Sequence, residues 1–400
     1  MTHHNYTLSR RRWLINSSAL LAVGGLAACG GGHADPRLDL AVQQARQRCQ
    51  QAADRAVAAG LVGAVFGQLL SQPDDTLPLA AAGRSALQQG RPLDGSERFG
   101  IGSNAKAMTA ALAARLVEQG KLRWDSRAAE LLKPELLHPD HQDLTLAQLL
   151  DHKGAILPFN TEVDPPVFLA YLQSHAGPLP SDEGGRRLFF CRWLLAQPAP
   201  QGVRPGRDFL YSNAGFAMAG AMLEAATGQR FTTLFEQQLC QPLGLAVAWA
   251  EPDPAKEPQG HVGDSAQQLQ LYEALPAEQQ LWFDVLRPAG GVRLAGAEYG
   301  RWLRWHMQAL QGRSTPLAAS YLQRLKTLTT GDYALGWAAA TANGQAQLGH
   351  NGAEAGFMAA VTLRQDGSQA AFTMSNTFGW RADGSSWVLE ALNQGLLGLL

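Results

Sequence analysis

The sequence predicts an α/β fold in which strands from both ends of the chain form one layer, with a mostly helical domain inserted between them. Segments rich in strand-forming residues lie at 61–87 and at 333–376. From about 103 to 286, apolar residues recur mostly at helical spacing and are interrupted by Pro and Gly. We therefore expect 38–102 and 287–400 to form an α/β domain, and 103–286 to form a helical domain.

The N-terminal part of this layer is expected to hold one helix and two strands. Residues 38–59 have the apolar spacing of an amphipathic helix. The next segment, LVGAVFGQLL at 61–70, has the composition and length of a strand, and LPLAAAGRSAL at 77–87 could pair with it as a hairpin. A helix followed by two strands therefore opens the folded part of the chain.

The C-terminal part is expected to return to strands. After the loop PAGGV at 288–292, the Trp-rich segment 298–310 has helical spacing, and so does the last segment, 385–400. Between these two helices lie four predicted strands: YALGWAAAT (333–341), QAQLGHNG (345–352), GFMAAVTLRQDG (356–367) and QAAFTMSN (369–376). The middle of the chain, by contrast, contains a Pro- and Gly-rich stretch at 157–185 that we expect to be a long surface excursion.

The composition is that of a globular protein, and we expect it not to bind nucleic acid. Of the 400 residues, 46% are hydrophobic and 17% are charged, which is enough apolar material for a large core. The formal net charge is -1, and no basic run interleaved with aromatic residues follows the first dozen positions. No GxGxxG motif follows a strand and no P-loop is present.

The N-terminus is similar to an export signal. SRRRWLI at 9–15 resembles the start of a twin-arginine signal, and the weakly hydrophobic segment NSSALLAVGGLAA follows it. A single-pass anchor is the alternative, but this segment is too short and too rich in Gly and Ser for a bilayer, which needs about 20 apolar residues. We therefore expect 1–28 to be a signal peptide.

The end of this signal is similar to a bacterial lipobox. Leu26-Ala27-Ala28-Cys29 would place a lipid on Cys29, which would become the mature N-terminus, and 29–37 would form a flexible tether. We expect an exported protein, periplasmic or at the cell surface, that meets a bacterial membrane only through this anchor. The other cysteines, Cys49, Cys191 and Cys240, have no CxxC spacing, so buried free thiols are expected, although one disulfide could form.

A lysine stands at an unfavourable place in FGIGSNAKAMTA, residues 99–110. Ser103 is expected to cap a helix that Gly120 can end. The apolar residues at helical spacing after it are Met108, Leu112 and Leu116. Lys106 would be the third helical residue, where the partial positive charge of the helix N-terminus disfavours a cation.

This placement suits a lysine that acts as a base. A nucleophilic serine needs a base because its own pKa is far too high for it to react unaided. Lys106 would lie one helical turn from Ser103, and burial together with the helix N-terminus would lower the pKa of its amine. An ordinary capping serine beside a solvated lysine is the alternative, and an isolated S-x-x-K pattern favours that alternative.

Two further motifs favour the catalytic interpretation of Ser103 and Lys106 over the structural one. Tyr211 and Asn213 stand in YSN, on a turn before an expected helix, and His350 opens HNG at the end of one predicted strand and before another. In this order, S-x-x-K, Y-x-N and H-x-G resemble the signatures of the penicillin-binding proteins, class C β-lactamases and related esterases. The resemblance covers nearly all the chain from about residue 60 to residue 384.

Several longer segments carry the same resemblance. They are GSERFGIGSNAKAMTA, LTLAQLLDHKGAI, PGRDFLYSNAGFAMAGAMLEAATGQRF, PAGGVRLAGAEYGRWLRW and YALGWAAA. Two departures stand out: Asp151, Lys153 and Ala155 occupy places where the family's LLTHTSGL segment has Thr, Thr and Gly, and 158–185 matches no family segment. The resemblance implies an antiparallel sheet flanked by helices.

The resemblance also implies a role for each motif residue. Ser103 would attack a carbonyl and be acylated, and Lys106 would take its proton. Tyr211 would share in proton transfer to the leaving group and from the deacylating water. Asn213 would hydrogen-bond Lys106 or the substrate amide. No metal or organic cofactor would be needed, so we expect no cofactor.

The oxyanion would be bound by the backbone N–H groups of Ser103 and Ala353, the latter from the strand expected to begin after Gly352. His350 replaces the lysine of K-T-G, and a histidine with a pKa near ~6.5 is mostly neutral at pH 7, which weakens recognition of a β-lactam carboxylate. The alternative is a structural histidine satisfied by a neighbouring loop. H-x-G resembles the esterases and D-amino-acid peptidases of the family.

The sequence therefore predicts a serine hydrolase that forms an acyl-enzyme and acts on esters, small amides or D-amino-acid peptides. A β-lactamase or a penicillin-binding DD-peptidase is the first alternative, and a noncatalytic binding lipoprotein with the same fold is an alternative of another class. No G-x-S-x-G elbow is present. His138, Asp140 and His141 could in principle bind a metal, but they lie in a Pro-containing loop with no further ligand in view, which is more typical of plain surface.

Overall fold

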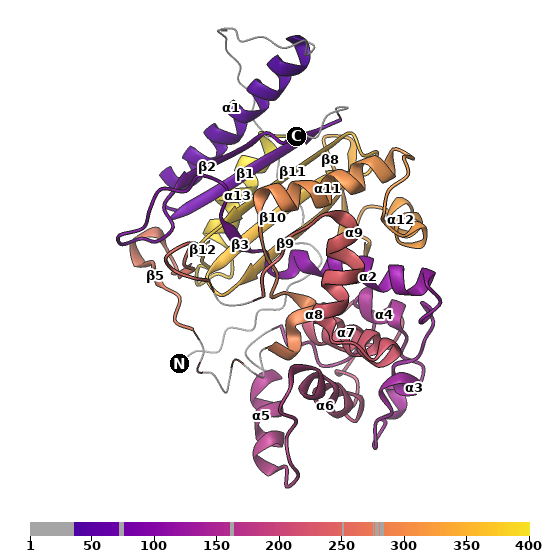
Figure 1. Cartoon of the computed structure of the whole chain (residues 1–400). Helices are drawn as coiled ribbons and strands as arrows, with labels where there is room; N and C mark the ends of the chain where they lie inside the picture. Colours follow the sequence, from indigo (N-terminus) through magenta and orange to yellow (C-terminus); the bar gives the residue numbers. More distant parts are fainter. Residues whose placement is uncertain are drawn as a thin grey trace.

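The computed structural model describes residues 36–71, 76–160, 164–249, 252–274, 276, 280 and 284–400. The expected signal peptide, Cys29 and most of the tether lie outside the described residues. Figure 1 shows a broad sheet with helices on its faces and a second group of helices gathered at one end.

A seven-stranded sheet forms the centre of the structure, in the order β2-β1-β11-β10-β9-β8-β7, and all its strand pairs are antiparallel. Its strands are β1 (Gly63–Leu70), β2 (Leu79–Gly83), β7 (Tyr333–Ala334), β8 (Trp337–Ala342), β9 (Gln345–Glu354), β10 (Phe357–Arg364) and β11 (Gln369–Ser375). In this sheet β1 pairs with β11, so that Ala64 lies opposite Ser375. The predicted antiparallel sheet built from both ends of the chain is confirmed.

The two faces of the sheet carry separate cores because side chains alternate along a strand. On β1, Phe66 packs with α1 (Pro36–Ala58) and α13 (Trp387–Leu397). Its neighbour Val65 belongs to the larger core on the opposite face, which α11 (Gly296–Leu310) covers. These three helices confirm the amphipathic, Trp-rich and C-terminal helices expected from the sequence.

The larger core continues from the sheet into the group of helices at its end (Figure 1). These helices are α2 (Ala105–Glu118), α3 (Ala128–Leu132), α4 (Leu146–Leu150), α5 (Asp164–Ser174), α6 (Glu183–Leu195), α7 (Asn213–Thr227), α8 (Phe231–Leu234) and α9 (Gln241–Leu243); α12 (Ala319–Lys326) packs on α2 and α11. A π-helical turn, Phe235–Cys240, joins α8 to α9. As expected, α2 ends just before Gly120, which takes a φ of +69°.

The stretch 157–185 is only partly the surface excursion that the sequence predicts. It contains α5, whose Phe168 lies with its ring centroid 4.9 Å from those of Phe190 and Trp193 on α6. The Pro pair that favours a loop falls in the first turn of α5, where a missing N–H costs no helical hydrogen bond. Burial of Phe168 thus turns a Pro-rich segment into a packed helix.

Five short strands were not predicted because two or three residues are too few for a visible periodicity. One set, β4 (His261–Val262), β5 (Gln270–Leu271) and β12 (Thr377–Phe378), forms a small sheet; the other, β3 (Arg98–Gly100) and β6 (Arg293–Ala295), forms an antiparallel pair. Of these, β3 leads directly into the turn that carries Ser103. The predicted limits of the two domains stay a prediction.

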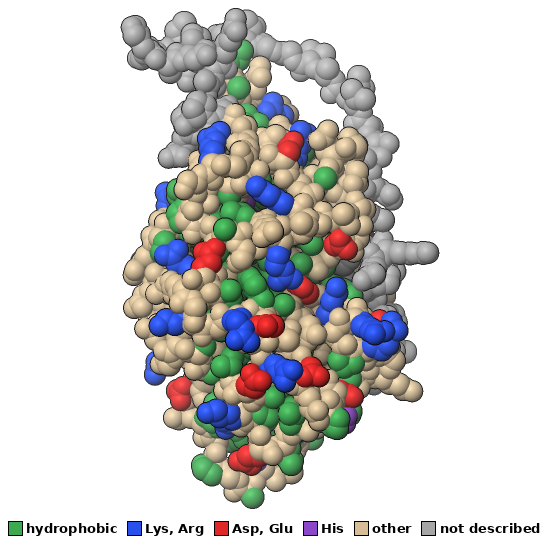
Figure 2. Space-filling model, turned by 90° about the vertical axis from the view of Figure 1, so that its right-hand side faces the viewer, with side chains coloured by type: hydrophobic (Ala, Val, Ile, Leu, Met, Phe, Trp, Pro, Cys, Tyr) green, Lys and Arg blue, Asp and Glu red, His purple; other side chains and the backbone are tan. Residues whose placement is uncertain are grey.

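The surface carries mixed charge. On the face in Figure 2, Lys and Arg side chains are interspersed with Asp and Glu side chains and do not gather in one region. Within the described ranges, no helix has the length and apolar character needed to cross a membrane. Cys49, Cys191 and Cys240 are buried free thiols, as the default interpretation expects.

Candidate active site

Ser103 lies in a single 3₁₀ turn, Gly102–Asn104, between β3 and α2. The expectation that Ser103 caps the helix is wrong, because α2 begins at Ala105 and Asn104 holds the capping position. Gly102 makes the difference: its φ of +47° is strained for any residue with a side chain and bends the chain sharply before the serine. Lys106 is consequently the second helical residue, and the Ser103 hydroxyl faces its amine.

The amine of Lys106 is completely buried and contacts three oxygen atoms. Nζ lies 2.9 Å from Oγ of Ser103, 2.7 Å from Oδ1 of Asn213 and 2.9 Å from the carbonyl oxygen of Ala289. An amide or carbonyl oxygen can only accept, so Asn213 and Ala289 take two N–H groups. In the neutral amine, the lone pair then faces the Ser103 hydroxyl. This arrangement can accept the serine proton.

The surroundings shift the pKa values of the two candidate bases in opposite directions. Burial lowers the pKa of Lys106 well below its usual value, although the negative charge of Glu354 raises it in part. Burial raises the pKa of Tyr211, and a hydrogen bond with Ser103 acts against this rise. Tyr211 therefore keeps its proton at neutral pH. Lys106 is the group that can be present as a free base.

Hydrogen bonds with the backbone and with a neighbouring amide side chain hold the motif of Tyr211 and Asn213 in place. Ser212 caps α7 by accepting the N–H of Gly215 at 2.8 Å. Nδ2 of Asn213 donates to the carbonyl oxygen of Phe159 at 3.0 Å, which leaves Oδ1 of Asn213 facing Lys106. Nδ2 of Asn160 donates to the carbonyl oxygen of Tyr211 at 2.9 Å. The segment around Phe159 thus orients the motif.

His152 supports the same motif and was given no role from the sequence. Its Nδ1 accepts the backbone N–H of Ser212 at 3.0 Å, and its ring centroid lies 4.3 Å from that of Tyr211 and 4.7 Å from that of Tyr333. Burial lowers the pKa of His152 well below its usual value, so the ring is neutral. The available signal was its position in LLDHKGAI, a segment already similar to the family's LLTHTSGL.

The departures of this chain from that family segment have local structural roles. Asp151 forms an ion pair with Arg324 of α12. Ala155 takes a φ of +49°, the left-handed conformation that the glycine usual at this place adopts more easily. The segment therefore keeps the backbone course expected of a glycine and adds an ion pair to α12.

His350 lies within β9, not at the end of a strand as expected, because β9 continues to Glu354. Nδ1 of its buried ring lies 2.6 Å from the carbonyl oxygen of Asn351, so this nitrogen carries the proton, and Nε2 accepts from the hydroxyl of Tyr333 at 2.9 Å. Burial lowers the pKa of His350 to about 3. The neutral ring is thus held by Tyr333 of β7 and by the backbone of its own strand, and its centroid lies 6.2 Å from that of Tyr211.

The hairpin that joins β9 to β10 orients the N–H of Ala353. Ala355 and Gly356 have φ values of +45° and +80°, which define a two-residue type I′ turn closed by the pair Glu354 and Phe357. In such a hairpin, the next pair along the strands is not hydrogen-bonded. The N–H of Ala353 therefore points away from β10, toward the edge of β9 that faces the Ser103 turn.

This edge lies in direct contact with the nucleophile turn. A side-chain carbon at Gly352 would fall 1.9 Å from the carbonyl oxygen of Ile101 and 2.9 Å from the nitrogen of Ser103, so only glycine fits there. A carbon at Gly102 would fall 2.4 Å from the nitrogen of Ala353. The structure thus brings together the two backbone N–H groups expected to bind an oxyanion.

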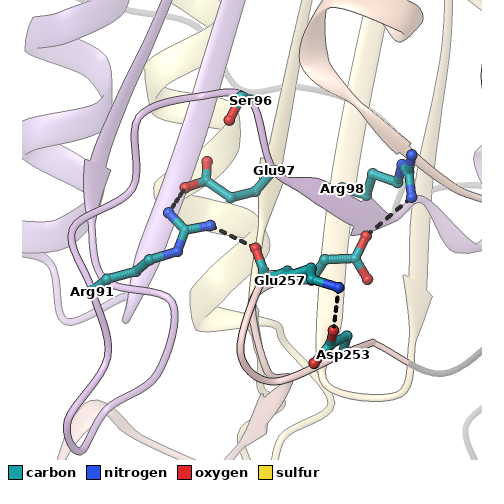
Figure 3. Close-up of a pocket in the computed structure, with 7 residues that line it drawn as sticks. Arg91, Ser96, Glu97, Arg98, Asp253 and Glu257 are labelled. Carbon is teal, nitrogen blue, oxygen red and sulfur yellow. Dashed lines mark hydrogen bonds and ion pairs between the residues drawn. The ribbon is translucent and has the colours of Figure 1, made fainter.

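The structure also has a charged surface pocket of about 400 Å³, which is lined by other residues than the Ser103 site (Figure 3). Its ion pairs join Arg91 to Glu97, Arg98 to Glu257 and Lys256 to Asp253. None of the lining residues is a candidate catalytic residue. Within the described residues, no group of three or more His, Cys, Asp or Glu side chains could hold a metal ion.

The fold and the site define an α/β protein with a Ser–Lys pair at the start of a helix, faced by a Tyr-x-Asn segment and by an H-x-G strand. The chain belongs to the beta-lactamase family, whose sequence model matches residues 47–394.

Curated relatives include enzymes of several kinds. Penicillin-binding protein 4 of Amycolatopsis lactamdurans is 26% identical over 281 residues, which cover 64% of this chain and 66% of the relative. D-alanyl-D-alanine-carboxypeptidase/endopeptidase AmpH of Escherichia coli (strain K12) is 25% identical over 220 residues, 52% of this chain and 49% of the relative. Esterase EstB of Burkholderia gladioli is 29% identical over 191 residues, 46% of each chain. The chain thus spans about half to two thirds of the length of these relatives.

Solved structures share the fold. The crystal structure of SurE is 22% identical, with a TM-score of 0.68 over 91% of this chain and 77% of that one. The D-amino acid amidase from Ochrobactrum anthropi SV3, solved with L-phenylalanine, is 18% identical, with a TM-score of 0.67 over 90% of this chain and 97% of that one.

Proposed function

We propose that this protein is a serine hydrolase that forms an acyl-enzyme on Ser103 and cleaves esters or small amides, including amides of D-amino acids. The observation that carries the proposal is the buried amine of Lys106, with two of its hydrogens taken by Asn213 and Ala289 and its remaining position facing the serine hydroxyl. A solvated lysine beside a capping serine would have none of these contacts. Family membership and relatives that are hydrolases support the same proposal.

In acylation, Oγ of Ser103 attacks the substrate carbonyl carbon while Lys106 takes the hydroxyl proton. The carbonyl oxygen becomes negative and is held by the N–H groups of Ser103 and Ala353. When the bond to the leaving alcohol or amine breaks, the proton that Lys106 took from Ser103 passes to that group through Tyr211, which hydrogen-bonds Ser103. Water then attacks the ester of Ser103 and gives a proton to Lys106 through Tyr211. As the bond between Oγ and the acyl carbon breaks, Lys106 gives this proton to Oγ, and the free acid leaves.

The neutral state of His350 directs the choice of substrate. A fixed cation at this place would attract a substrate carboxylate, whereas an imidazole whose pKa is lowered to about 3 carries no charge at working pH. We therefore place uncharged esters and amides ahead of substrates that present a carboxylate beside the scissile bond. Esterase EstB among the relatives supports this order.

A DD-peptidase is the second candidate because two relatives are named a penicillin-binding protein and a D-alanyl-D-alanine carboxypeptidase. A noncatalytic protein with this fold is the third. The three differ in what reacts with Ser103. Esters and D-amino-acid amides would acylate it in the first case, D-alanyl peptides in the second and nothing in the third.

The test is a substrate panel on the full chain and on Ser103→Ala. Short-chain p-nitrophenyl esters, D-amino-acid amides, a chromogenic cephalosporin and D-alanyl-D-alanine peptides are compared on the same preparations. We expect ester and amide turnover, one phosphonate label per chain on Ser103, and neither in Ser103→Ala. A folded wild type that takes no label and turns over none of these substrates would overturn the proposal in favour of a binding protein.

We also propose that the chain is exported and anchored by lipid at Cys29. SRRRWLI at 9–15 and the lipobox-like Leu26-Ala27-Ala28-Cys29 support this. A protein tethered in this way meets substrates in the periplasm or outside the cell.

A further inference from the structure

A carboxylate lies behind the nucleophile turn and belongs to none of the sequence motifs. Glu354 is the last residue of β9. Its Oε2 accepts the N–H of Gly291 at 2.6 Å, and the N–H of Gly102 is a second backbone donor to the carboxylate. Glu354 thus joins three separate segments: the turn before Ser103, the loop after Ala289 and the hairpin after Ala353.

The surrounding backbone leaves a space that fits this carboxylate. A side-chain carbon at Gly100 would fall 2.9 Å from Oε1 of Glu354, and one at Gly290 would fall 2.9 Å from Oε2. Either contact is closer than a carbon and an oxygen normally approach. The carboxylate therefore sits where two chain segments both lack a side chain.

The loop bound by Glu354 also holds the base. The carbonyl oxygen of Ala289 accepts from Nζ of Lys106, and two residues later the N–H of Gly291 donates to Glu354. A shift of this loop would move the carbonyl oxygen of Ala289, which binds one N–H of Lys106 and so keeps the lone pair of the amine directed at Ser103. Glu354 is thereby linked to the base through a single short loop.

We propose that Glu354 is a positioning residue, which ties the Ser103 turn, the Ala289–Gly291 loop and the end of β9 together so that nucleophile, base and oxyanion donors stay aligned. The proposal rests on the proposed function, because it concerns the parts that this function uses. Glu354 acts through backbone groups and does not itself touch the substrate carbonyl.

The charge of Glu354 adds an electrostatic effect on the base. The charged groups that act on its carboxylate are Arg293 of β6 and Lys106 of α2, and Arg293 also forms an ion pair with Glu257. Burial raises the pKa of Glu354, whereas these cations and the two backbone donors lower it. The negative charge in turn raises the pKa of Lys106. Removal of the charge should lower the pKa of the base.

The test compares Glu354→Gln with wild type and with a matched control. A glutamine keeps one acceptor oxygen, loses the negative charge and places an amide N–H₂ group where the second carboxylate oxygen lies, so it binds the two backbone donors less well. We expect kcat for a p-nitrophenyl ester to fall roughly 10- to 100-fold with KM changed less than about threefold, since alignment in the transition state is lost. The acid limb of the kcat/KM profile should shift to lower pH, because Lys106 loses a nearby negative charge.

Glu97→Gln is the control. The Glu97 side chain is fully buried and accepts the backbone N–H groups of Asp94 and Gly95, at 3.2 and 2.9 Å, so the chemical change is the same. Glu97 pairs with Arg91 (Figure 3), and neither Arg91 nor the two backbone donors belong to the catalytic candidates. This variant should keep the acid limb of wild type, whatever its Tm.

The outcomes separate this proposal from the proposed function. Wild type labelled by phosphonate on Ser103, with slower labelling of Glu354→Gln, supports both. The role of Glu354 alone would be overturned by equal labelling rates, a kcat within twofold of wild type and an unshifted acid limb. A folded wild type that takes no label and turns over none of the substrates would overturn both proposals. If Glu354→Gln does not fold, Glu354→Asp is the variant to measure, because it keeps the charge on a shorter side chain. Its kcat should fall while the acid limb of its pH profile stays where it is in wild type. An unchanged kcat would refute the positioning role.

Discussion

Nζ of Lys106 lies 2.9 Å from Oγ of Ser103, and the amine is fully enclosed by protein. Only two residues separate the pair in the chain, yet the contact depends on distant segments. Asn213 and Ala289 take the other two positions around the nitrogen. The pair is therefore sensitive to any change that alters the charge or the hydrogen bonds of this amine.

Replacement of Lys106 by Arg should remove the base and keep the cation. Arginine does not deprotonate in proteins, so no lone pair would face Ser103. Ester turnover should fall by ~10² to 10⁴, which is typical of the loss of a general base. The measurement is kcat/KM beside thermal melting, and near-normal turnover in a folded variant would falsify the role of Lys106.

Lys106 should also impose a pH dependence on stability. Burial lowers its pKa in the folded state, whereas the unfolded chain has the ordinary value near ~10.4. Between these two pKa values the unfolded state binds one proton more, so the free energy of unfolding rises with pH by about 1.4 kcal/mol per unit from this group, and the gain is lost as pH falls through the window.

Lys106→Met lacks this contribution and gives the comparison. Urea unfolding of both proteins at pH 7 and pH 9 measures the two slopes. Wild type should gain stability over this interval relative to Lys106→Met. Equal slopes would show that the amine remains protonated in the folded protein, which is incompatible with its use as a base.

His350→Lys should change the preference between substrate classes. The added cation attracts the carboxylate of a cephalosporin and has no such effect on an uncharged ester. The ratio of cephalosporin to ester turnover should rise, while His350→Gln, which is neutral, should leave the ratio near that of wild type. Efficient cephalosporin hydrolysis by wild type, with little ester activity, would favour the β-lactamase alternative.

Cys29→Ser should release the protein from membranes after export. A lipobox cysteine carries more than one acyl chain, and a single chain would hold the protein only marginally. Fractionation of cells that express each form measures the effect. A wild type that is already recovered in the soluble periplasmic fraction would contradict the anchor.

The long elements of the fold could be predicted from the sequence because each repeats an apolar spacing over many residues. α1, α11 and α13 and the longer strands of the main sheet follow such patterns. The segment 333–341, predicted as one strand, is divided into β7 and β8 by a turn at Leu335 and Gly336, which both have positive φ. The pairs β3–β6 and β4–β5 could not, since so short a strand is defined by its partner alone. Phe168 in α5 shows the same limit, because its burial depends on rings of α6.

The site shows which residues local motifs reveal. Ser103, Lys106, Tyr211 and Asn213 belong to patterns with fixed spacing, and the structure brings all four together. Glu354 was missed because its role depends on backbone groups far away in sequence. His152 and Tyr333 escaped notice for a related reason: their partners become neighbours only in the folded chain.

The pairing of β1 with β11 has a consequence for the order of events during synthesis. The ribosome makes β1, Ser103 and Lys106 long before it makes the strands that complete the sheet. Contacts of such large sequence separation form late, because the intervening chain must first be ordered. Ala353, which faces the serine turn, emerges only near the end of translation. On the proposed function, a nascent chain therefore carries Ser103 without the N–H of Ala353, and it should be unable to hydrolyse substrate until almost the whole protein has been made.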